Sequence, residues 1–214
     1  MTFVFLDANI VAKPVTRTLL MVGASRSGFT VGWSATAEAE AARHMRSNAT
    51  RPEAVRRHYG GEPTTAGNVA GRFSATDPKD RQLLADAEAA GAQFLITENV
   101  DDYAAGDLAS VGISAVNPDL FLAERLTRAA YSVVIRGFVE RQVNPPTTGA
   151  QFHAAIAKNH PRLFAAHADL YDIEPEQGIH PEPRAIFRGA RCLRCEQIIA
   201  DPDSIIHGLG PECR

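Results

Sequence analysis

The chain has 214 residues, of which 45% are apolar and 22% charged, with 16 Gly and 13 Pro. This composition allows a folded core and excludes a collagen-like, low-complexity or wholly disordered chain. No apolar run reaches the roughly 18 residues that a membrane span needs, and Asp7 comes too early for a signal peptide. Three cysteines, an odd number, argue against a secreted disulfide framework. We therefore expect a soluble cytoplasmic protein.

The net charge of -3 gives the whole molecule no attraction for a polyanion, so any nucleic-acid partner would need a local basic patch. Residues 43–58 contain one acid, Glu53, and seven basic or histidine residues: Arg43, His44, Arg46, Arg51, Arg56, Arg57 and His58. A nucleic-acid contact and an ordinary solvated helix surface fit this segment equally well.

Apolar patterning and capping signals predict strands alternating with helices. Residues 3–6 form a short apolar run typical of a strand buried on both faces, and further strands are expected at 29–33, 93–97 and 113–116. Helices are expected at 16–24, 34–47 and 77–90, and over much of 117–173 with a break at 144–146. In the third of these, Asp77 would cap the helix and Gly91 would end it. This order predicts an α/β fold with a mostly parallel sheet.

Acidic and amide side chains follow the predicted strands at their carboxyl ends, where open α/β sheets bind ligands. Asp7 ends the first strand, Asn99, Asp101 and Asp102 follow the third, and Asp80 begins the helix that leads into it. Carboxylates brought together repel one another and need protons or a cation, and all-oxygen ligation selects a hard cation such as Mg²⁺ or Mn²⁺. Surface acids on loops are the simpler alternative.

The chain resembles the PIN domain, the fold of VapC-type toxins and related ribonucleases, over about residues 1–175. The matching motifs, in chain order, are an apolar strand ending in Asp7-Ala8-Asn9, Trp33-Ser34 followed by Glu40, Asp77-Pro78-Lys79-Asp80, Leu95-Ile96-Thr97-Glu98-Asn99, Asp102-Tyr103 and Asn117-Pro118-Asp119. The resemblance implies a three-layer PIN-like sandwich and an Mg²⁺- or Mn²⁺-dependent endoribonuclease acting on RNA. It also implies a small antitoxin partner for a toxin role, and homodimers, which PIN proteins often form.

The resemblance assigns metal-binding roles to Asp7 and Asp80, with Asp77 as a capping alternative to Asp80. Glu38 and Glu40 are about 200° apart around a helix, so both cannot face one site, and the spacing from Trp33-Ser34 favours Glu40. The fourth position is open: Asn99 stands where some relatives have Asp, and Asp102 is the nearest carboxylate. Candidate phosphate contacts are Lys13, Arg17, Arg43 and Arg81, for each of which an ordinary surface charge is the simpler alternative.

All three cysteines lie near the end of the chain, as Cys192-Leu193-Arg194-Cys195 and Cys213. A CxxC turn places two thiolates on one tetrahedral metal, so we expect a structural Zn²⁺ held with Cys213 and with His207 as the fourth ligand, His180 being the runner-up. The segment resembles a small bacterial zinc module with the pattern CxxC…GxGPxC, seen here in Gly208-Leu209-Gly210-Pro211-Glu212-Cys213, although Glu196 stands where that module usually has a glycine.

These observations predict four regions: a PIN-like nuclease domain at 1–135, a helical extension at 136–175, a proline-rich linker at 176–189 and a zinc module at 190–214. The expected activity is metal-dependent hydrolysis of RNA. Because Asn99 leaves the acid set incomplete, an adaptor with a degenerate PIN site that binds nucleic acid or protein is the alternative. A phosphatase built on Asp7 is disfavoured, since Asn9 stands where a second aspartate is needed.

Overall fold

The structure is a computed structural model that describes residues 1–59, 61–173 and 185–214. Its centre is a five-stranded sheet in the order β2-β1-β3-β4-β5, formed by β1 (Thr2–Leu6), β2 (Phe29–Gly32), β3 (Phe94–Ile96), β4 (Ser114–Val116) and β5 (Phe187–Arg188). The first four strands pair in parallel, and β5 runs antiparallel to β4. Every residue of β3 and β4 is buried, which explains the apolar run of β3; in β4, the buried Ser114 side chain accepts a hydrogen bond from the Arg191 N–H.

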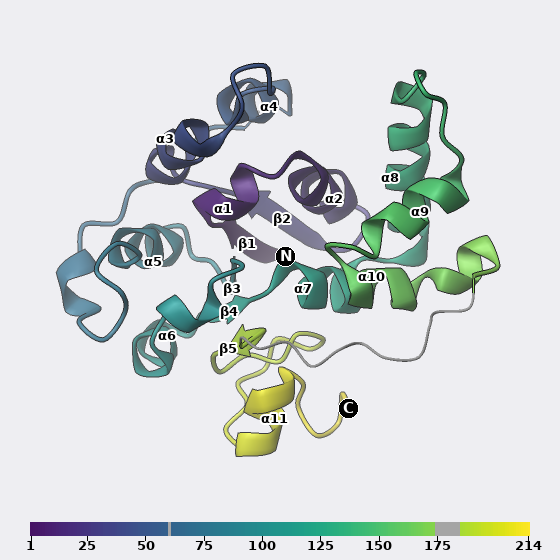
Figure 1. Cartoon of the computed structure of the whole chain (residues 1–214). Coiled ribbons are helices and arrows are strands. Elements are labelled where there is room, and N and C mark those ends of the chain that lie inside the picture. Colours follow the sequence, from purple (N-terminus) through teal and green to yellow (C-terminus); the bar gives the residue numbers. More distant parts are fainter. Residues whose placement is uncertain (60, 174–184) are drawn as a thin grey trace.

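Helices cover both faces of the sheet (Figure 1). On one side lie α5 (Arg81–Ala89) and α6 (Ala105–Val111), and on the other lie α2 (Pro14–Ala24) and α7 (Pro118–Arg125). The short α1 (Ala8–Val11) packs against α3 (Ala35–His44), which in turn contacts α4 (Pro52–His58). The predicted α/β architecture with a mostly parallel sheet between helical layers is confirmed.

Three further helices lie between α7 and β5 in the chain and pack against the α2–α7 side. They are α8 (Arg128–Arg141), α9 (Gly149–Ile156) and α10 (Pro161–Ala166), with α8 against α2 and α10 against α7. The described residues also form three 3-10 turns: η1 (Ala70–Arg72), η2 (Val100–Asp102) and η3 (Ala168–Tyr171). Across the described residues, no helix combines the length and apolar character that crossing a bilayer would require.

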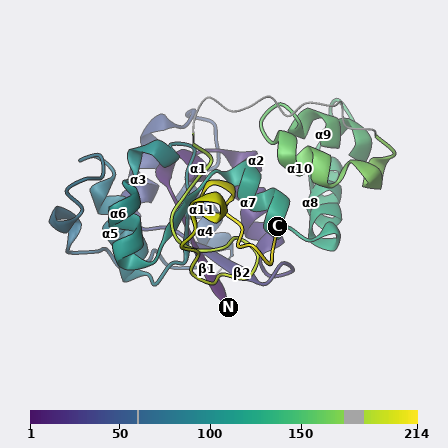
Figure 2. The ribbon, with the colours of Figure 1, turned by 90° about the horizontal axis from the view of Figure 1, so that it is seen from below.

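The C-terminal segment lies against the edge of the sheet and contains α11 (Pro202–His207), as Figure 2 shows from below. Part of the expected linker, Phe187–Arg188, is the edge strand β5, while residues 176–184 lie outside the described residues. Cys192 and Leu193 are fully buried in the main core. Arg125 of α7 donates hydrogen bonds to the Leu193 carbonyl at 2.9 Å and to Glu196 at 2.9 Å. The segment is therefore anchored on the sheet, although the four-region division stays a prediction.

Several element boundaries differ from those that the sequence predicts. The helix expected at 77–90 begins at Arg81 with Asp80 as its N-cap, because the backbone N–H of Asp77 bonds the Asp102 carbonyl and residues 78–80 form a turn. Gly91 follows that helix with φ +68°, as a helix end requires. Among the described residues, four helices were not predicted: α1, α4, α6 and α11, each of seven residues or fewer.

Candidate active site

Asp7 is held in place at the carboxyl end of β1 by groups from β3, from α1 and from the segment that follows β3. Its backbone N–H donates to the Ile96 carbonyl at 3.0 Å. One carboxylate oxygen, Oδ2, accepts hydrogen bonds from Thr97 Oγ1 at 2.6 Å and from Asn9 Nδ2 at 2.8 Å, and the Tyr103 hydroxyl lies 3.5 Å away. Sequence reasoning assigned no role to Asn9 or Thr97, although parallel pairing of Leu6 with Ile96 already places residue 97 beside residue 7.

Four of the predicted site residues line one cavity of about 470 Å³ at this edge of the sheet: Asp7, Glu40, Asp80 and Asn99. They come from β1, α3, the start of α5 and the turn after β3. Asp102 lies instead in an adjoining cavity of about 290 Å³, which shares Lys79 and Asn99 with the first. A carboxylate oxygen from each of Asp77, Asp80 and Asp102 lies within 4.8 Å of the others, so the structure also brings the capping alternative Asp77 into the acidic cluster.

Burial and mutual repulsion raise the pKa values of Asp7 and Asp80. Burial raises the pKa of Asp7 from 3.8 to about 6, with a smaller contribution from Glu40. Burial also raises the pKa of Asp80 to about 7, and the charge on Asp7 adds to this effect. Among the described residues, no group donates a hydrogen bond to the buried Oδ2 of Asp80. A cluster of this kind favours a bound proton or a cation.

The residues around the cavity fit a hard divalent cation. The oxygen donors are three carboxylates and the Asn99 side chain, with Asp102 next to them, and the His44 imidazole is a further lining group. Asp80 Oδ2 accepts no hydrogen bond among the described residues and lies 3.9 Å from Lys79 Nζ, so it is available as a ligand. A divalent charge would relieve the repulsion that raises the pKa values of Asp7 and Asp80.

Glu38 and Glu40 face different surroundings, as their separation around α3 requires. Glu40 lines the cavity with Asp7. Glu38 accepts hydrogen bonds from Trp33 Nε1 at 2.9 Å and from Arg56 Nε at 2.8 Å, and these bonds lower its pKa against the opposing effect of burial. Ser34 fixes the start of the helix by accepting a hydrogen bond from the Ala37 N–H at 3.2 Å. Glu38 therefore joins α3 to α4 and lies outside the acidic cavity.

Of the four candidate phosphate contacts, Lys13 alone lines the acidic cavity, where it forms an ion pair with Glu98. Arg17 is buried and donates to the Val11 carbonyl, and Arg81 donates to the carbonyls of Ser74 and Thr76. Arg43 is exposed on α3.

Lys79 is a cavity residue to which the sequence assigned no role. Its ammonium group lies 3.0 Å from Asp102 and 3.9 Å from Asp80, and the bond to Asp102 is the main reason why its pKa is raised. No pattern in the sequence singles out this lysine, because its role depends on the turn that precedes α5.

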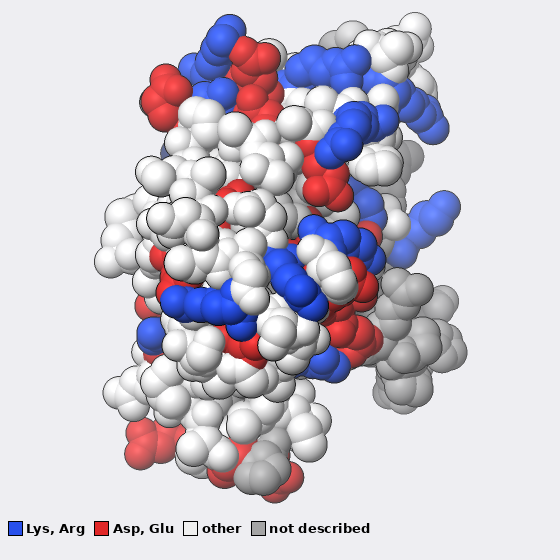
Figure 3. Space-filling model, turned by 90° about the vertical axis from the view of Figure 1, so that its left-hand side faces the viewer, with Lys and Arg blue, Asp and Glu red and all other residues white. Residues whose placement is uncertain are grey.

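The basic segment 43–58 is partly engaged within the fold. Arg51 donates to the Ala42 carbonyl at 2.8 Å, Arg56 binds Glu38, and Arg57 pairs with Glu53. Figure 3 shows a face on which Lys and Arg side chains are interspersed with Asp and Glu, without one continuous basic surface. The geometry therefore favours the solvated-surface interpretation for much of this segment.

The three cysteines form a compact thiol cluster beside the sheet. Their sulfur atoms lie within 4.8 Å of one another. The Gly210 N–H donates to Cys192 Sγ at 3.3 Å. Burial opposes ionisation of Cys192, but hydrogen bonds from the backbone N–H groups of Cys195, Gly210 and Arg194 lower the pKa of its thiol to about 7. Hydrogen bonds from Cys195 and Cys192 instead raise the pKa of the Cys213 thiol to about 11. Three cysteine sulfurs this close together suit a thiophilic metal such as Zn²⁺.

Among the described residues, no histidine joins the three cysteines as a fourth ligand. His207 is exposed at the last position of α11 and is not part of the group of ligand atoms within 4.8 Å. His180 lies outside the described residues.

The fold and the two sites define a class: a mostly parallel α/β protein with a cavity at the carboxyl ends of β1 and β3 in which three carboxylates meet, and a separate thiol cluster. A curated protein named "Putative ribonuclease VapC50" from Mycobacterium tuberculosis (strain ATCC 25618 / H37Rv) is similar to part of the chain, with 34% identity over 92 residues. The match covers 42% of this chain and 54%, about half, of that relative. No protein-family model and no solved structure matches the chain.

Proposed function

We propose that this protein is a metal-dependent endoribonuclease of the PIN type that hydrolyses phosphodiester bonds in RNA. The observation that carries the proposal is the cavity in which Asp7, Glu40, Asp80 and Asn99 converge from separate segments, with a buried Asp80 oxygen that accepts no hydrogen bond in the described chain. The similarity to VapC50 supports RNA as the substrate, since that relative is named as a putative ribonuclease.

In this proposal Asp7, Glu40 and Asp80 hold one Mg²⁺ or Mn²⁺, with Asn99 or Asp102 as a further ligand. When bound, such an ion polarises the scissile phosphate and lowers the pKa of a water nucleophile. Thr97 and Asn9 orient Asp7 by binding its Oδ2, which fixes the rotamer of the carboxylate. Lys79 and Lys13 lie at the same cavity and supply positive charge to attract and position the phosphate backbone.

The test is hydrolysis of a mixed-sequence RNA by wild type, Asp7→Asn and Asp203→Asn, with Mn²⁺ present or chelated. Asp203 is an exposed carboxylate in α11 and serves as the matched control. We expect cleavage by wild type and Asp203→Asn with Mn²⁺, and none by Asp7→Asn or after chelation. Chelation-resistant cleavage would contradict the metal site. RNA binding without cleavage by folded wild type would favour the adaptor.

A toxin role with a small antitoxin partner belongs to the same proposal and rests on the VapC50 similarity alone. Induced expression in a bacterium should then arrest growth, and Asp7→Asn should not. If expression of a wild type that cleaves RNA leaves growth unchanged, the toxin role is excluded in that host, while the nuclease activity stands.

For the tail we propose one structural Zn²⁺ held by Cys192, Cys195 and Cys213, with His207 as the fourth ligand after a local rearrangement of its side chain. The ion would cross-link a segment of about 25 residues that has little core of its own. Its position beside β5 and α7 supports a stabilising role for the sheet edge.

A further inference from the structure

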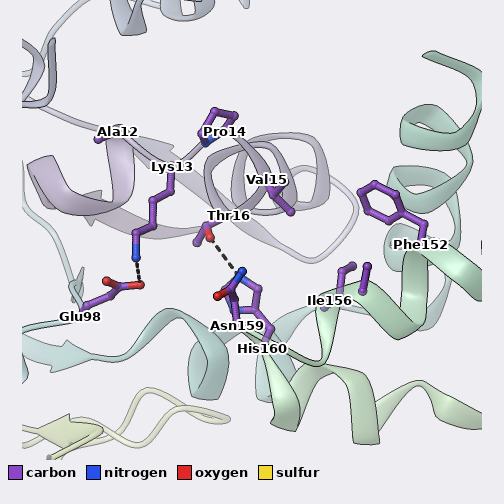
Figure 4. A pocket seen from close by; sticks show the side chains of 11 residues that line it. Ala12, Lys13, Pro14, Val15, Thr16, Glu98, Phe152, Ile156, Asn159 and His160 are labelled. Carbon is purple, nitrogen blue, oxygen red and sulfur yellow. Dashed lines mark hydrogen bonds and ion pairs between the residues drawn. The ribbon is translucent and has the colours of Figure 1, made fainter. Parts of the chain in front are cut away.

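A second cavity of about 420 Å³ adjoins the acidic one, between the start of α2 and the α9–α10 helices (Figure 4). Pro14 and Val15 line it from α2, and Phe152 and Ile156 line it from α9. Its volume lies within the roughly 300–1,000 Å³ of small-molecule sites. It is a largely apolar cavity with few polar groups, which is the usual character of a site for a flat organic group.

The two cavities share part of their wall at the segment between α1 and α2. Ala12 and Lys13 line both of them, and Glu98, the ion-pair partner of Lys13, lines the apolar one. Figure 4 shows the Lys13–Glu98 pair at one end of the apolar cavity and Phe152 at the other. A molecule with its phosphate in the acidic cavity could therefore place an attached group in the apolar cavity.

The polar groups of the apolar cavity come from the short connection between α9 and α10. His160 is only 2% exposed, and its Nε2 lies 2.9 Å from Thr16 Oγ1. Within the described residues, its buried Nδ1 has no hydrogen-bond partner. The Asn159 side chain is exposed beside it, with no hydrogen bond in the described chain, and carries an amide donor and acceptor.

Phe152 offers an ordered aromatic ring. It stacks on Phe138 of α8 with ring centroids 4.7 Å apart and an interplanar angle of 17°, and Figure 4 shows its side chain directed toward the cavity. Single-stranded RNA is recognised by this combination of chemistry: unstacked bases lie against aromatic rings, and amide groups read their edges.

We propose that this apolar cavity binds the base of a nucleotide that flanks the scissile phosphate in single-stranded RNA. Phe152 and the α2 side chains contact the faces of the base, and Asn159 hydrogen-bonds to its edge. The contact between His160 and Thr16 fixes the connection between α9 and α10, and so positions Asn159. The inference rests on the proposed ribonuclease function, since the acidic cavity must hold the adjoining phosphate.

The experiment measures kcat/KM with Mn²⁺ on a short oligoribonucleotide of known cleavage site, and on versions with one abasic position at a time. For wild type, removing the base at one flanking position should lower kcat/KM by about 5- to 100-fold, the range that base–aromatic stacking supplies. In Phe152→Ala this abasic penalty should fall to less than about 2-fold. Phe152→Leu keeps an apolar side chain against Phe138 but removes the aromatic ring, so its abasic penalty should also fall to less than about 2-fold. This second variant controls for misfolding of Phe152→Ala.

Asn159→Ala and Asn48→Ala form a matched pair, because both asparagines are exposed and Asn48 lines neither cavity. Asn159→Ala should weaken discrimination among the four bases at the flanking position, and Asn48→Ala should not.

Each alternative outcome is distinguishable. If wild type cleaves RNA but its abasic penalties are the same in the Phe152 variants, the base pocket is refuted while the ribonuclease function stands. If folded wild type cleaves no RNA, the proposed function fails and the base pocket fails with it. If the Phe152 variants cleave normally but change the oligomeric state by light scattering, the cavity is an interface between copies of the chain and the proposal is overturned.

Discussion

The acidic cavity should destabilise the metal-free protein, and Asp80→Asn should therefore stabilise it. The pKa of Asp80 is raised from 3.8 to about 7 by burial and by the charge of Asp7. Between these pH values the folded state keeps a proton that the unfolded state has lost, so stability falls as pH rises. Each pKa unit corresponds to about 1.36 kcal/mol, which gives a cost of about 4 kcal/mol above pH 7 and less than about 2 kcal/mol at pH 5.

An asparagine at position 80 has nearly the same volume and carries no charge, and the buried Asp80 Oδ2 accepts no hydrogen bond in the described chain that would be lost. Because Asp7 and Asp80 titrate together, the cost belongs to the pair, and about 4 kcal/mol is an upper value for one substitution. For a chain of this length, that free energy raises Tm by roughly 8–16 °C.

The assay is thermal unfolding of wild type, Asp80→Asn and Asp203→Asn with a chelator present, at pH 5 and pH 8.5. Asp80→Asn should exceed wild type at pH 8.5, the excess should shrink by more than half at pH 5, and Asp203→Asn should match wild type at both. Added Mn²⁺ should raise the Tm of wild type more than that of Asp80→Asn. A Tm gap that is absent at pH 8.5, or independent of pH, would refute the electrostatic reasoning.

Three further predictions concern other parts of the molecule. Glu40→Gln should lower RNA cleavage by more than about 100-fold. Glu38→Gln should retain activity but lose about 1–3 kcal/mol of unfolding free energy, because Glu38 accepts hydrogen bonds from Arg56 and Trp33. The opposite pattern in matched assays would mean that the wrong face of α3 was chosen. Elemental analysis should find close to one zinc per chain in protein purified without chelators. Cys195→Ser should lose the zinc, and its Tm should fall by several degrees. Fewer than about 0.2 zinc per wild-type chain, or full occupancy in the variant, would contradict the thiol site. Gly189→Ala should lower the unfolding free energy, measured with denaturant, by roughly 2–4 kcal/mol, because its Cβ would lie 2.5 Å from Ser114 Cα at a φ of +146°. A Cβ at Gly106 meets nothing within 4 Å, so the control Gly106→Ala should change stability by less than about 1 kcal/mol. Equal effects would show that β5 is not paired as described.

The order of strands and helices is largely set by local sequence. The apolar run before Asp7, the Ser34 cap, Gly91 and the Asn117-Pro118 start all act over a few residues, and each is found close to its predicted position. Because parallel strands end at the same edge of a sheet, this local order was also enough to bring Asp7, Asp80 and Asn99 to one cavity.

Contacts between distant segments decided the rest. The sequence suggests that Arg17 and Arg56 are surface charges, but both are buried. Arg17 donates to the Val11 carbonyl, and Arg56 pairs with the Glu38 carboxylate. The tail reads as a separate module behind a proline-rich linker, yet Phe187–Arg188 completes the sheet and Glu196 binds Arg125, a residue 71 positions earlier in the chain. Periodicity and capping describe only neighbours in sequence, whereas edge pairing, ion pairs and cavity walls depend on which surfaces meet after the chain has folded.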